Sequence, residues 1–312
     1  MSQPTSEPTI LVTGASGLIG QRVLARLSAE GRRALGIDIA LKPGQHPVTI
    51  ADLGDIHRLH GLARAEGVGS IIHCGAVSGP MVMIDNPYGI VQANVTGTAN
   101  MLELARTFGM RRLVFCSSTS AFGPTRAPEA GTPGLAEDTP LRPSSVYGAT
   151  KVAAEQLLAG YRQQHRLDAV AIRLCWVYGP GRTTDCVIRT LIEDAQAGRP
   201  SRLPFGRDFP RQFIHVDDAV DALLRAHDAP SCPQPVYTAT GGSFLTIGEV
   251  AEVVGRVLPA ADIDVAPGPD PLDDYQHRFD TTAIARDLGF VPRHTLEDGV
   301  RAYAAWLADR RA

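Results

Sequence analysis

Short apolar runs alternate with longer amphipathic segments through the first half of the chain, and this alternation restricts the fold more than any other feature. The apolar runs are rich in Val, Ile and Leu, which is the composition of strands buried on both faces. Strands of this kind separated by helices indicate a parallel sheet with helices on either side, and therefore an α/β fold. The predicted strands are contained in TILVTG (9–14), RALGID (33–38), SIIHCGA (70–76) and RRLVFCSS (111–118), with one more in DAVAIRLCWVYGPG (168–181), and the predicted helices in QRVLARLSAEG (21–31) and GIVQANVTGTANMLELARTFG (89–109).

Two changes in sequence character divide the chain. The segment 123–143 carries five prolines and little periodicity, which predicts a surface loop that leads into Tyr147. Beyond Tyr178 the regular alternation ends, and the pattern indicates short helices and strands. We therefore predict a first domain over 1–174, to which 208–234 returns, and a smaller C-terminal α/β domain over 175–312.

Composition excludes several classes of function. Of 312 residues, 44% are hydrophobic and 20% are charged, and the net charge of −3 provides no basic field for nucleic acid or a membrane surface. No apolar run has the length of a membrane span, and the polar N-terminal segment MSQPTSEPT lacks the apolar core of a signal peptide. These features predict a cytoplasmic protein.

Cysteine and histidine usage agrees with that location. The five cysteines form no CxxC pair, which is typical of free thiols in a reducing compartment. Cys116 and Cys175 lie in apolar runs, so we expect both to be buried packing residues. The nine histidines show no metal-ligand spacing, so we expect no metal.

The stretch LVTGASGLIG (11–20) places Gly14, Gly17 and Gly20 between a predicted strand and a predicted helix. Glycines at such a turn permit close approach of the backbone to a pyrophosphate, and the helix N-terminus offers free N–H groups to the phosphates. The second strand ends at Asp38, where a carboxylate accepts the adenosine ribose hydroxyls and repels a 2′-phosphate. An ordinary turn with a solvated acid is the alternative. Together the features predict a Rossmann-type doubly wound sheet that binds NAD rather than NADP.

The stretch SSVYGATK (144–151) places Tyr147 four residues before Lys151. On a helix these side chains are neighbours, and a cation beside a phenol favours the phenolate. A phenol in this position suits proton transfer near neutral pH. So short a pattern also arises by chance, so its interpretation depends on the other motifs.

A series of motifs in this order resembles the extended short-chain dehydrogenase/reductase family, in its NAD-dependent epimerase/dehydratase branch. The resemblance covers nearly the whole chain. It implies a smaller C-terminal domain that binds the substrate. The motifs are TGASGLIG (13–20), ADLGD (51–55), HCGA (73–76), NVTGT (94–98), FCSSTSAFG (115–123), YGATK (147–151) and RQFIHVDDAV (211–220).

The resemblance implies a role for each matched residue. Lys151 holds the nicotinamide ribose and favours the phenolate of Tyr147, which removes the proton of a substrate hydroxyl as hydride passes to the nicotinamide. Ser118 orients the same substrate oxygen, unless it only bonds its own backbone, in which case Ser117 or Thr119 acts instead. The implied cofactor-binding residues are Gly14, Gly17, Leu18, Ile19, Gly20, Asp38, Asp52, Leu53, Cys74, Gly75, Ala76, Asn94, Tyr147, Lys151 and Val177.

Departures from the family pattern bear on the substrate. Members that act on nucleotide sugars usually carry Asn before VYGP and an Arg near the C-terminus, where this chain has Trp176 and Asp270. Carboxylates do not bind phosphate. The 4,6-dehydratase members place an Asp–Glu pair where Thr119 and Ser120 stand here, so dehydratase activity is disfavoured. The implied substrate-binding residues are Ser78, Ser118, Thr119, Trp176, Arg182 and Arg211, with either arginine as the anchor for an anionic group or only a surface residue.

These features predict an NAD-dependent dehydrogenase that acts on a secondary hydroxyl of a sugar, sugar acid or related polyol. One alternative is a nucleotide-sugar (UDP-sugar type) 4-epimerase that keeps NAD tightly bound and returns the hydride to the other face. Another is a non-catalytic NAD-binding regulator, which the presence of both Tyr147 and Lys151 disfavours. The helices near 91–108 and 152–161 resemble the pair that forms a four-helix interface in this family, so we expect a homodimer.

Overall fold

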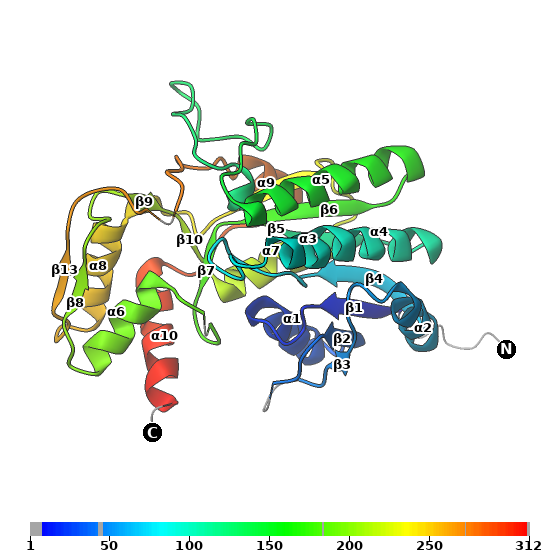
Figure 1. Ribbon diagram of the computed structural model, residues 1–312, viewed down its shortest axis with the longest axis horizontal. Helices are drawn as coiled ribbons and strands as arrows, with labels where there is room; N and C mark the ends of the chain where they lie inside the picture. Colours follow the sequence, from blue (N-terminus) through cyan, green and yellow to red (C-terminus); the bar gives the residue numbers. More distant parts are fainter. Residues whose placement is uncertain (1–7, 43–45, 183, 272, 311–312) are drawn as a thin grey trace. The chain divides into compact units, whose positions relative to one another are not determined.

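The computed structural model describes residues 8–42, 46–182, 184–271 and 273–310 (Figure 1). The predicted polar tail before Pro8 lies outside these residues. By their contacts the residues form two compact units, and the segment 122–142 belongs to the second unit rather than to the first. The first unit comprises Met1–Ala121, Pro143–Arg173 and Val220–Tyr237, and the second comprises Phe122–Arg142, Leu174–Ala219 and Thr238–Ala312.

A seven-stranded sheet forms the centre of the first unit. Its strand order is β11–β6–β5–β4–β1–β2–β3, and the pairs β1–β2, β2–β3, β1–β4 and β4–β5 are parallel. This order is that of a dinucleotide-binding doubly wound sheet with one further edge strand, which confirms the predicted fold class. The strands are β1 Thr9–Thr13, β2 Ala34–Asp38, β3 Thr49–Ile50, β4 Val68–His73, β5 Leu113–Ser118, β6 Ala169–Leu174 and β11 Val236–Ala239.

Helices cover both faces of this sheet. Buried side chains of α2, α4 and α5 pack together with Ile37, Ile71 and Phe115, which places these helices on one face. Gly36 alternates with Ile37 along β2, and a Cβ at Gly36 would lie 2.8 Å from Leu24 of α1, so α1 packs on the opposite face. The helices that lie wholly or partly in this unit include α1 Leu18–Ala29, α2 Ile56–Glu66, α3 Pro87–Val91, the π-helical η1 Gln92–Thr96, α4 Gly97–Thr107, the short η2 Thr119–Ala121, α5 Val146–His165 and α7 Val216–Asp228.

Two predicted elements differ in detail from the structure. The helix expected over 89–109 is interrupted by a π-helical segment, η1 Gln92–Thr96, between α3 and α4. The segment 168–181, in which one strand was expected, contains both β6 and a second strand, β7 Trp176–Tyr178, which pairs in parallel with β10 Phe213–His215. Cys175 lies between the two strands and is buried, as predicted.

The second unit has its own apolar core, formed by side chains of α6, α8 and α10. Its remaining strands form two short pairs, β9 with β12 and β8 with β13. The elements are α6 Val187–Gln196, β8 Ser201–Leu203, β9 Pro210–Arg211, β12 Leu245–Thr246, α8 Ile247–Val257, β13 Ile263–Val265, α9 Thr282–Leu288 and α10 Leu296–Asp309. Among the described residues, no helix combines the length and apolar character needed to cross a bilayer.

The proline-rich segment, all of which the structure describes, carries no helix or strand and many of its residues are exposed, as expected of a surface loop, but part of it is anchored in the interior. Leu135 is 5% exposed and packs with Phe122 and Phe279. The Leu135 N–H donates to the Arg278 carbonyl at 2.8 Å, and the Leu135 carbonyl accepts from the Asp280 N–H at 2.9 Å. These contacts anchor the segment within the second unit.

Candidate active site

The turn between β1 and α1 has a shape that only glycine permits. Gly14 has φ +64°, and a Cβ there would lie 2.7 Å from the carbonyl group of Cys74. A Cβ at Gly20 would lie 2.2 Å from the Gly14 carbonyl oxygen, so α1 starts in direct contact with the turn. Gly17 precedes α1 and provides no capping side chain, which leaves the first-turn N–H groups of Leu18 and Ile19 without a side-chain cap. This is the cradle that a pyrophosphate requires.

Asp38 lies beside this turn, at the end of β2. Its carboxylate accepts from the Ser16 N–H at 2.9 Å and from the Ile39 N–H at 2.7 Å. Each carboxylate oxygen retains further acceptor capacity, so the group suits the hydroxyls of a ribose. The amide donors and this acceptor together fit a dinucleotide with an unmodified adenosine ribose.

Buried polar groups fix the loop after β4. The Thr13 hydroxyl accepts from the Gly75 N–H at 2.9 Å and lies 2.6 Å from His73 Nδ1. Burial, assisted by the nearby Lys151 ammonium, lowers the pKa of His73 to about 3. A neutral His73 therefore acts as a structural link, a role that the sequence analysis missed although HCGA contains it.

The other predicted cofactor residues of the first unit differ in exposure. Asp52 is exposed, and its carboxylate accepts from the Gly54 N–H at 2.7 Å. The Leu53 side chain packs against Gly75, where an added Cβ would lie only 2.9 Å from it. Cys74 and Ala76 are half-buried, whereas Ser78 is exposed.

Asn94 lies in the π-helical segment and is 2% exposed. It pairs with both backbone groups of Val77, at 2.8 and 3.1 Å, and donates to the Thr150 hydroxyl at 3.0 Å. Thr150 in turn donates to the Tyr147 carbonyl at 2.7 Å. Asn94 therefore ties the loop after β4 to the first turn of α5, and π-helical segments of this kind are frequent at functional sites.

Tyr147 and Lys151 lie on successive turns of α5, as their spacing predicts. They are 7% and 4% exposed, and Lys151 Nζ lies 5.6 Å from the centre of the Tyr147 ring. Lys151 Nζ donates to the Cys116 carbonyl at 2.9 Å, so β5 fixes the position of the ammonium group.

The three hydroxyls at the end of β5 have different surroundings. Ser117 is buried and donates to the Glu155 carboxylate at 2.6 Å, which commits it to the interior. Thr119 is also buried. Ser118 is half-buried, lies 3.2 Å from the Ser120 hydroxyl and accepts from the Ser120 N–H at 3.1 Å. Of the three hydroxyls, that of Ser118 is the most accessible to a substrate.

Four predicted or neighbouring residues of the second unit form one cluster, called here the Arg211 cluster: Trp176, Arg211, Asp270 and Asp273. Arg211 donates to Asp270 at 2.5 Å and to Asp273 at 2.7 Å, and its guanidinium lies 4.6 Å from the centre of the Trp176 ring. The Trp176 indole N–H donates to Asp273 at 3.0 Å. Burial, assisted by Asp270, raises the pKa of Asp273 above its usual range against the opposing effect of Arg211.

Arg182 has different partners. Its guanidinium donates to the carbonyls of Val177 and Asp185, and the Arg182 carbonyl accepts from the Tyr303 hydroxyl at 2.8 Å. These carbonyl partners are neutral, and the guanidinium also lies 5.8 Å from the centre of the Trp176 ring. Val177 is half-buried within β7.

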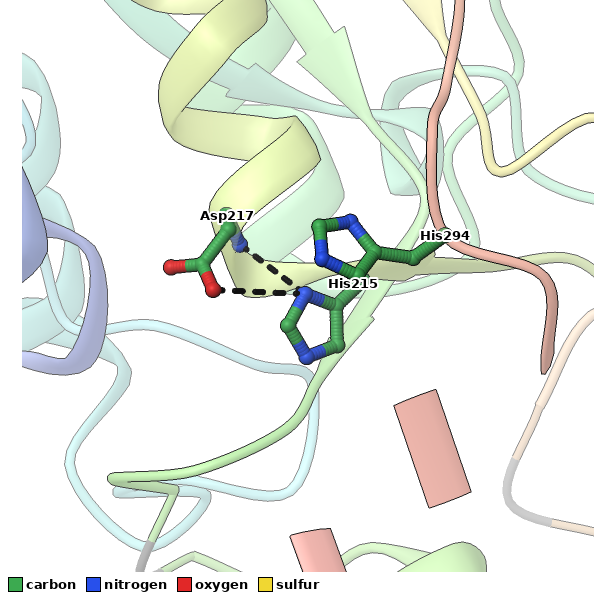
Figure 2. Close-up of side chains that lie close together, drawn as sticks. All are labelled: His215, Asp217 and His294. Atoms are coloured by element: carbon green, nitrogen blue, oxygen red, sulfur yellow. Dashed lines mark hydrogen bonds and ion pairs between the residues drawn. The ribbon is translucent and has the colours of Figure 1, made fainter. Parts of the chain in front are cut away.

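A third group of side chains, His215, Asp217 and His294, was not predicted (Figure 2). Their possible ligand atoms lie within 4.8 Å of one another, but the two rings stack at 4.1 Å with 28° between their planes. Ring lone pairs lie in the ring planes, so stacked rings do not direct them at one tetrahedral ion. His294 Nδ1 also lies 3.0 Å from Asp218, which accepts from the His294 N–H at 3.1 Å. This group therefore fits a structural link between the start of α7 and the segment before α10.

The sheet order, the glycine turn and the acid at the end of β2 define a Rossmann-type α/β protein built to bind a dinucleotide. A family model described as "NAD dependent epimerase/dehydratase family" matches residues 10–238, and the chain belongs to this family of enzymes. The predicted family is thereby confirmed.

Individual relatives match the chain over nearly its full length. It is 31% identical to the UDP-glucose 4-epimerase of Mycolicibacterium smegmatis, over 93% of this chain and 95% of the relative. It is 27% identical to the UDP-glucuronate 4-epimerase of Thermodesulfobacterium geofontis, over 95% of each. Among solved structures, the UDP-glucose 4-epimerase of Thermus thermophilus in complex with NAD is similar at a TM-score of 0.83 and 26% identity, over 96% of this chain and 99% of that one.

Proposed function

We propose that the protein is an NAD-dependent oxidoreductase that transfers hydride between NAD and a secondary hydroxyl of a sugar, sugar acid or related polyol. The family and the glycine turn support the cofactor. The observation that carries the substrate class is the pairing of Arg211 with two carboxylates. We assign cofactor binding to the first unit and substrate binding to the second.

The residues of the first unit supply the proton chemistry. Tyr147 acts as the base that takes the proton of the substrate hydroxyl, and Lys151 holds the ribose. Ser118 donates to the same substrate oxygen. NAD, when bound, supplies a nicotinamide that accepts or returns a hydride. Two hydrogen bonds support this assignment because they fix the first turn of α5: Asn94 donates to the Thr150 hydroxyl, and Thr150 donates to the Tyr147 carbonyl.

The Arg211 cluster disfavours a nucleotide diphosphate. One positive charge faces two carboxylates, so a phosphate would meet a site that already carries excess negative charge. The indole N–H of Trp176 is also committed to Asp273. Carboxylates instead accept hydrogen bonds from hydroxyl groups, which suits a polyol. Arg182 keeps its charge and is the better of the two predicted anchors for the carboxylate of a sugar acid.

A second candidate is a UDP-sugar 4-epimerase, because the relatives from Mycolicibacterium smegmatis and Thermodesulfobacterium geofontis are named as UDP-glucose and UDP-glucuronate 4-epimerases and match 93% and 95% of this chain. It would use the same Ser118, Tyr147 and Lys151, but it would require a nucleotide clamp. A non-catalytic NAD-binding regulator is the third alternative, and any turnover that depends on Tyr147 excludes it.

A substrate panel separates these functions. The enzyme is incubated with NAD and with aldoses, aldonates, uronates, UDP-sugars or GDP-sugars, and NADH absorbance and product stereochemistry are followed. NADH formation with free sugars or acids supports the dehydrogenase. Inversion at C4 of a UDP-sugar without added NAD, and no NADH from the other compounds, would show that the epimerase is correct.

Tyr147→Phe tests the chemistry itself. We expect turnover to fall about 100-fold or more with unchanged NAD affinity, because the variant loses the base but keeps the ring. Near-normal turnover would remove Tyr147 from the mechanism.

We also propose that the protein is a cytoplasmic homodimer, with α4 and α5 of two copies forming the interface. Apolar side chains of α5 outside the first-unit core, such as Val152, are only half-buried, and Tyr161 joins the two helices through a hydrogen bond to Glu103 at 3.1 Å. Light scattering at micromolar concentration is expected to give twice the mass of the chain, and a monomeric mass would exclude this assembly.

A further inference from the structure

Cys74 and Cys116 follow a pair of residues that face each other on two neighbouring strands. His73, the last residue of β4, pairs with Phe115 in the parallel register of β4 and β5; Cys74 is the first residue after β4, and Cys116 lies within β5. The rings of His73 and Phe115 stack at 5.6 Å, so they share one face of the sheet and the two cysteines share the other. Neighbouring strands lie about 4.8 Å apart, which is within the Cα separation of about 4.4–6.8 Å that a disulfide spans.

The two thiols influence each other's protonation. The Cys74 thiol, followed by the Lys151 ammonium, lowers the pKa of Cys116 against the effect of burial, whereas the Cys116 thiol and burial raise the pKa of Cys74. Both residues are half-buried rather than buried, which corrects the expectation that Cys116 is a buried packing residue. Cys175, Cys186 and Cys232 are buried. Reactive thiols combine partial exposure with a nearby cation. Cys74 and Cys116 have both, because they are half-buried and lie near the Lys151 ammonium.

The backbones of both cysteines touch the cofactor machinery. The carbonyl group of Cys74 fills the space beside Gly14 of the glycine turn. The carbonyl of Cys116 accepts the hydrogen bond of Lys151. A covalent bond that draws the two strand ends together would therefore shift the turn and the lysine at once.

We propose that Cys74 and Cys116 form an oxidisable dithiol, and that a low-molecular-weight disulfide converts it to a cross-strand disulfide that weakens NAD binding. The effect on NAD rests on the function proposed above, whereas the thiol chemistry does not.

The reaction is two successive thiol–disulfide exchanges. The Cys116 thiolate attacks one sulfur of oxidised glutathione and releases one glutathione thiolate. Cys74, after losing its proton to solvent, attacks the Cys116 sulfur of the mixed disulfide and releases the second glutathione. Two protein thiols are oxidised, one glutathione disulfide is reduced to two thiols, and the two protein protons end on the released glutathiones.

The test uses the full chain, treated with oxidised glutathione and then desalted. We expect intact mass to show the loss of two hydrogen atoms, and non-reducing digestion to give one linked peptide pair containing Cys74 and Cys116. Calorimetric titration should show an NAD dissociation constant raised about tenfold, the effect of losing one hydrogen bond to a charged group. Dithiothreitol should restore the original value, and saturating NAD should slow the oxidation.

Each variant is compared with its own reduced form, so its basal affinity does not matter. Cys116→Ser, and Cys116→Ala as a second version, should abolish both the linked peptides and the oxidation-dependent change. Cys232→Ala, which removes a buried thiol elsewhere, should keep both. Stable glutathione adducts without the linked peptides would overturn the proposal, and so would a disulfide that leaves NAD affinity unchanged. If the reduced protein binds no NAD, the proposed function fails, and the linked peptides alone decide whether the dithiol exists.

Discussion

Each unit contains a largely buried arginine paired with carboxylates, but the ratio of positive to negative charge differs between the two clusters. In the first unit Arg173 and Glu155 are 3% and 2% exposed and pair at 2.7 Å, with Ser117 donating to the same carboxylate at 2.6 Å. In the second unit Arg211 is 9% exposed and faces both Asp270 and Asp273, which are 11% and 17% exposed.

The difference separates a structural role from a recognition role. A balanced, enclosed pair compensates its own charges, and this one joins α5, the helix that carries Tyr147, Lys151 and Glu155, to Arg173 of β6. The Arg211 cluster buries two carboxylates with one guanidinium, and burying more negative than positive charge is unfavourable for the fold alone. We therefore interpret the Arg211 cluster as part of the substrate site, and four predictions test the contrast.

The largest effect is expected in the first unit. Glu155→Ala leaves Arg173 buried without its carboxylate, so the free energy of unfolding should fall by about 3–5 kcal/mol. Urea titration at pH 7 measures it. The control is Glu193→Ala, which removes the carboxylate paired with Arg189; both side chains of this pair are 27% exposed. The control should lower the free energy of unfolding by about 0.3–0.5 kcal/mol. If Glu155→Ala lowers the free energy of unfolding by less than the control does, the buried pair does not contribute to stability.

The second prediction concerns ligand preference. The double variant Asp270→Asn, Asp273→Asn releases Arg211 from both carboxylates, and one charge-assisted hydrogen bond to phosphate of about 1.5–3 kcal/mol should tighten UDP binding about 10- to 100-fold. Isothermal titration with UDP measures it. Asp264→Asn changes an exposed carboxylate paired with Arg207 and serves as the matched control, with no expected change. Unaltered UDP affinity in the double variant would contradict the role assigned to the cluster.

The third prediction isolates the indole. Trp176→Phe keeps an aromatic ring beside Arg211 but removes the N–H that Asp273 accepts. Asp273 retains Arg211 and the Asp274 N–H as donors, so the loss of stability should be only about 1 kcal/mol. Thermal unfolding measures it, and Trp306→Phe in α10 controls for the smaller ring. Equal losses in the two variants would show that the hydrogen bond is immaterial.

The smallest effect is a change in pH dependence. Because the pKa of Asp273 is raised in the folded protein, the folded state binds more protons than the unfolded state above the usual carboxyl pKa of about 4. Its contribution to the free energy of unfolding is therefore present at low pH and lost as pH rises through the raised pKa. Asp273→Asn lacks this contribution, so wild type should lose stability relative to the variant as the pH rises above about 4. Parallel urea titrations at several pH values measure the difference, and parallel curves would contradict the raised pKa.

Local sequence patterns predicted those features of the fold and site that depend only on residues close together in the chain. The glycine turn, Asp38 at the end of its strand, and the Tyr147–Lys151 spacing each lie within one or two adjacent elements, so their placement follows from backbone geometry. The doubly wound parallel class could be predicted for the same reason, because buried strands alternate with helices along the chain.

Contacts between distant segments could not be predicted. Arg211 is separated from Asp270 by 59 residues and from Asp273 by 62, and no local rule pairs them. The burial of Cys116 was predicted wrongly because an apolar run does not reveal that one face of a strand opens near its end. The π-helical segment was missed because its period differs little from that of an α-helix over so few residues.

The discontinuous make-up of the first unit sets an order for its synthesis. Its sheet ends in β11, the edge strand contributed by Val236–Ala239, and its last segment is Val220–Tyr237. A chain growing on the ribosome has made six of the seven strands by residue 174, yet it must then extend through Leu174–Ala219, which belongs to the second unit, before the seventh can be added. Neither unit can be released as a finished N-terminal piece, and translation of 220–239 determines when the first unit is completed.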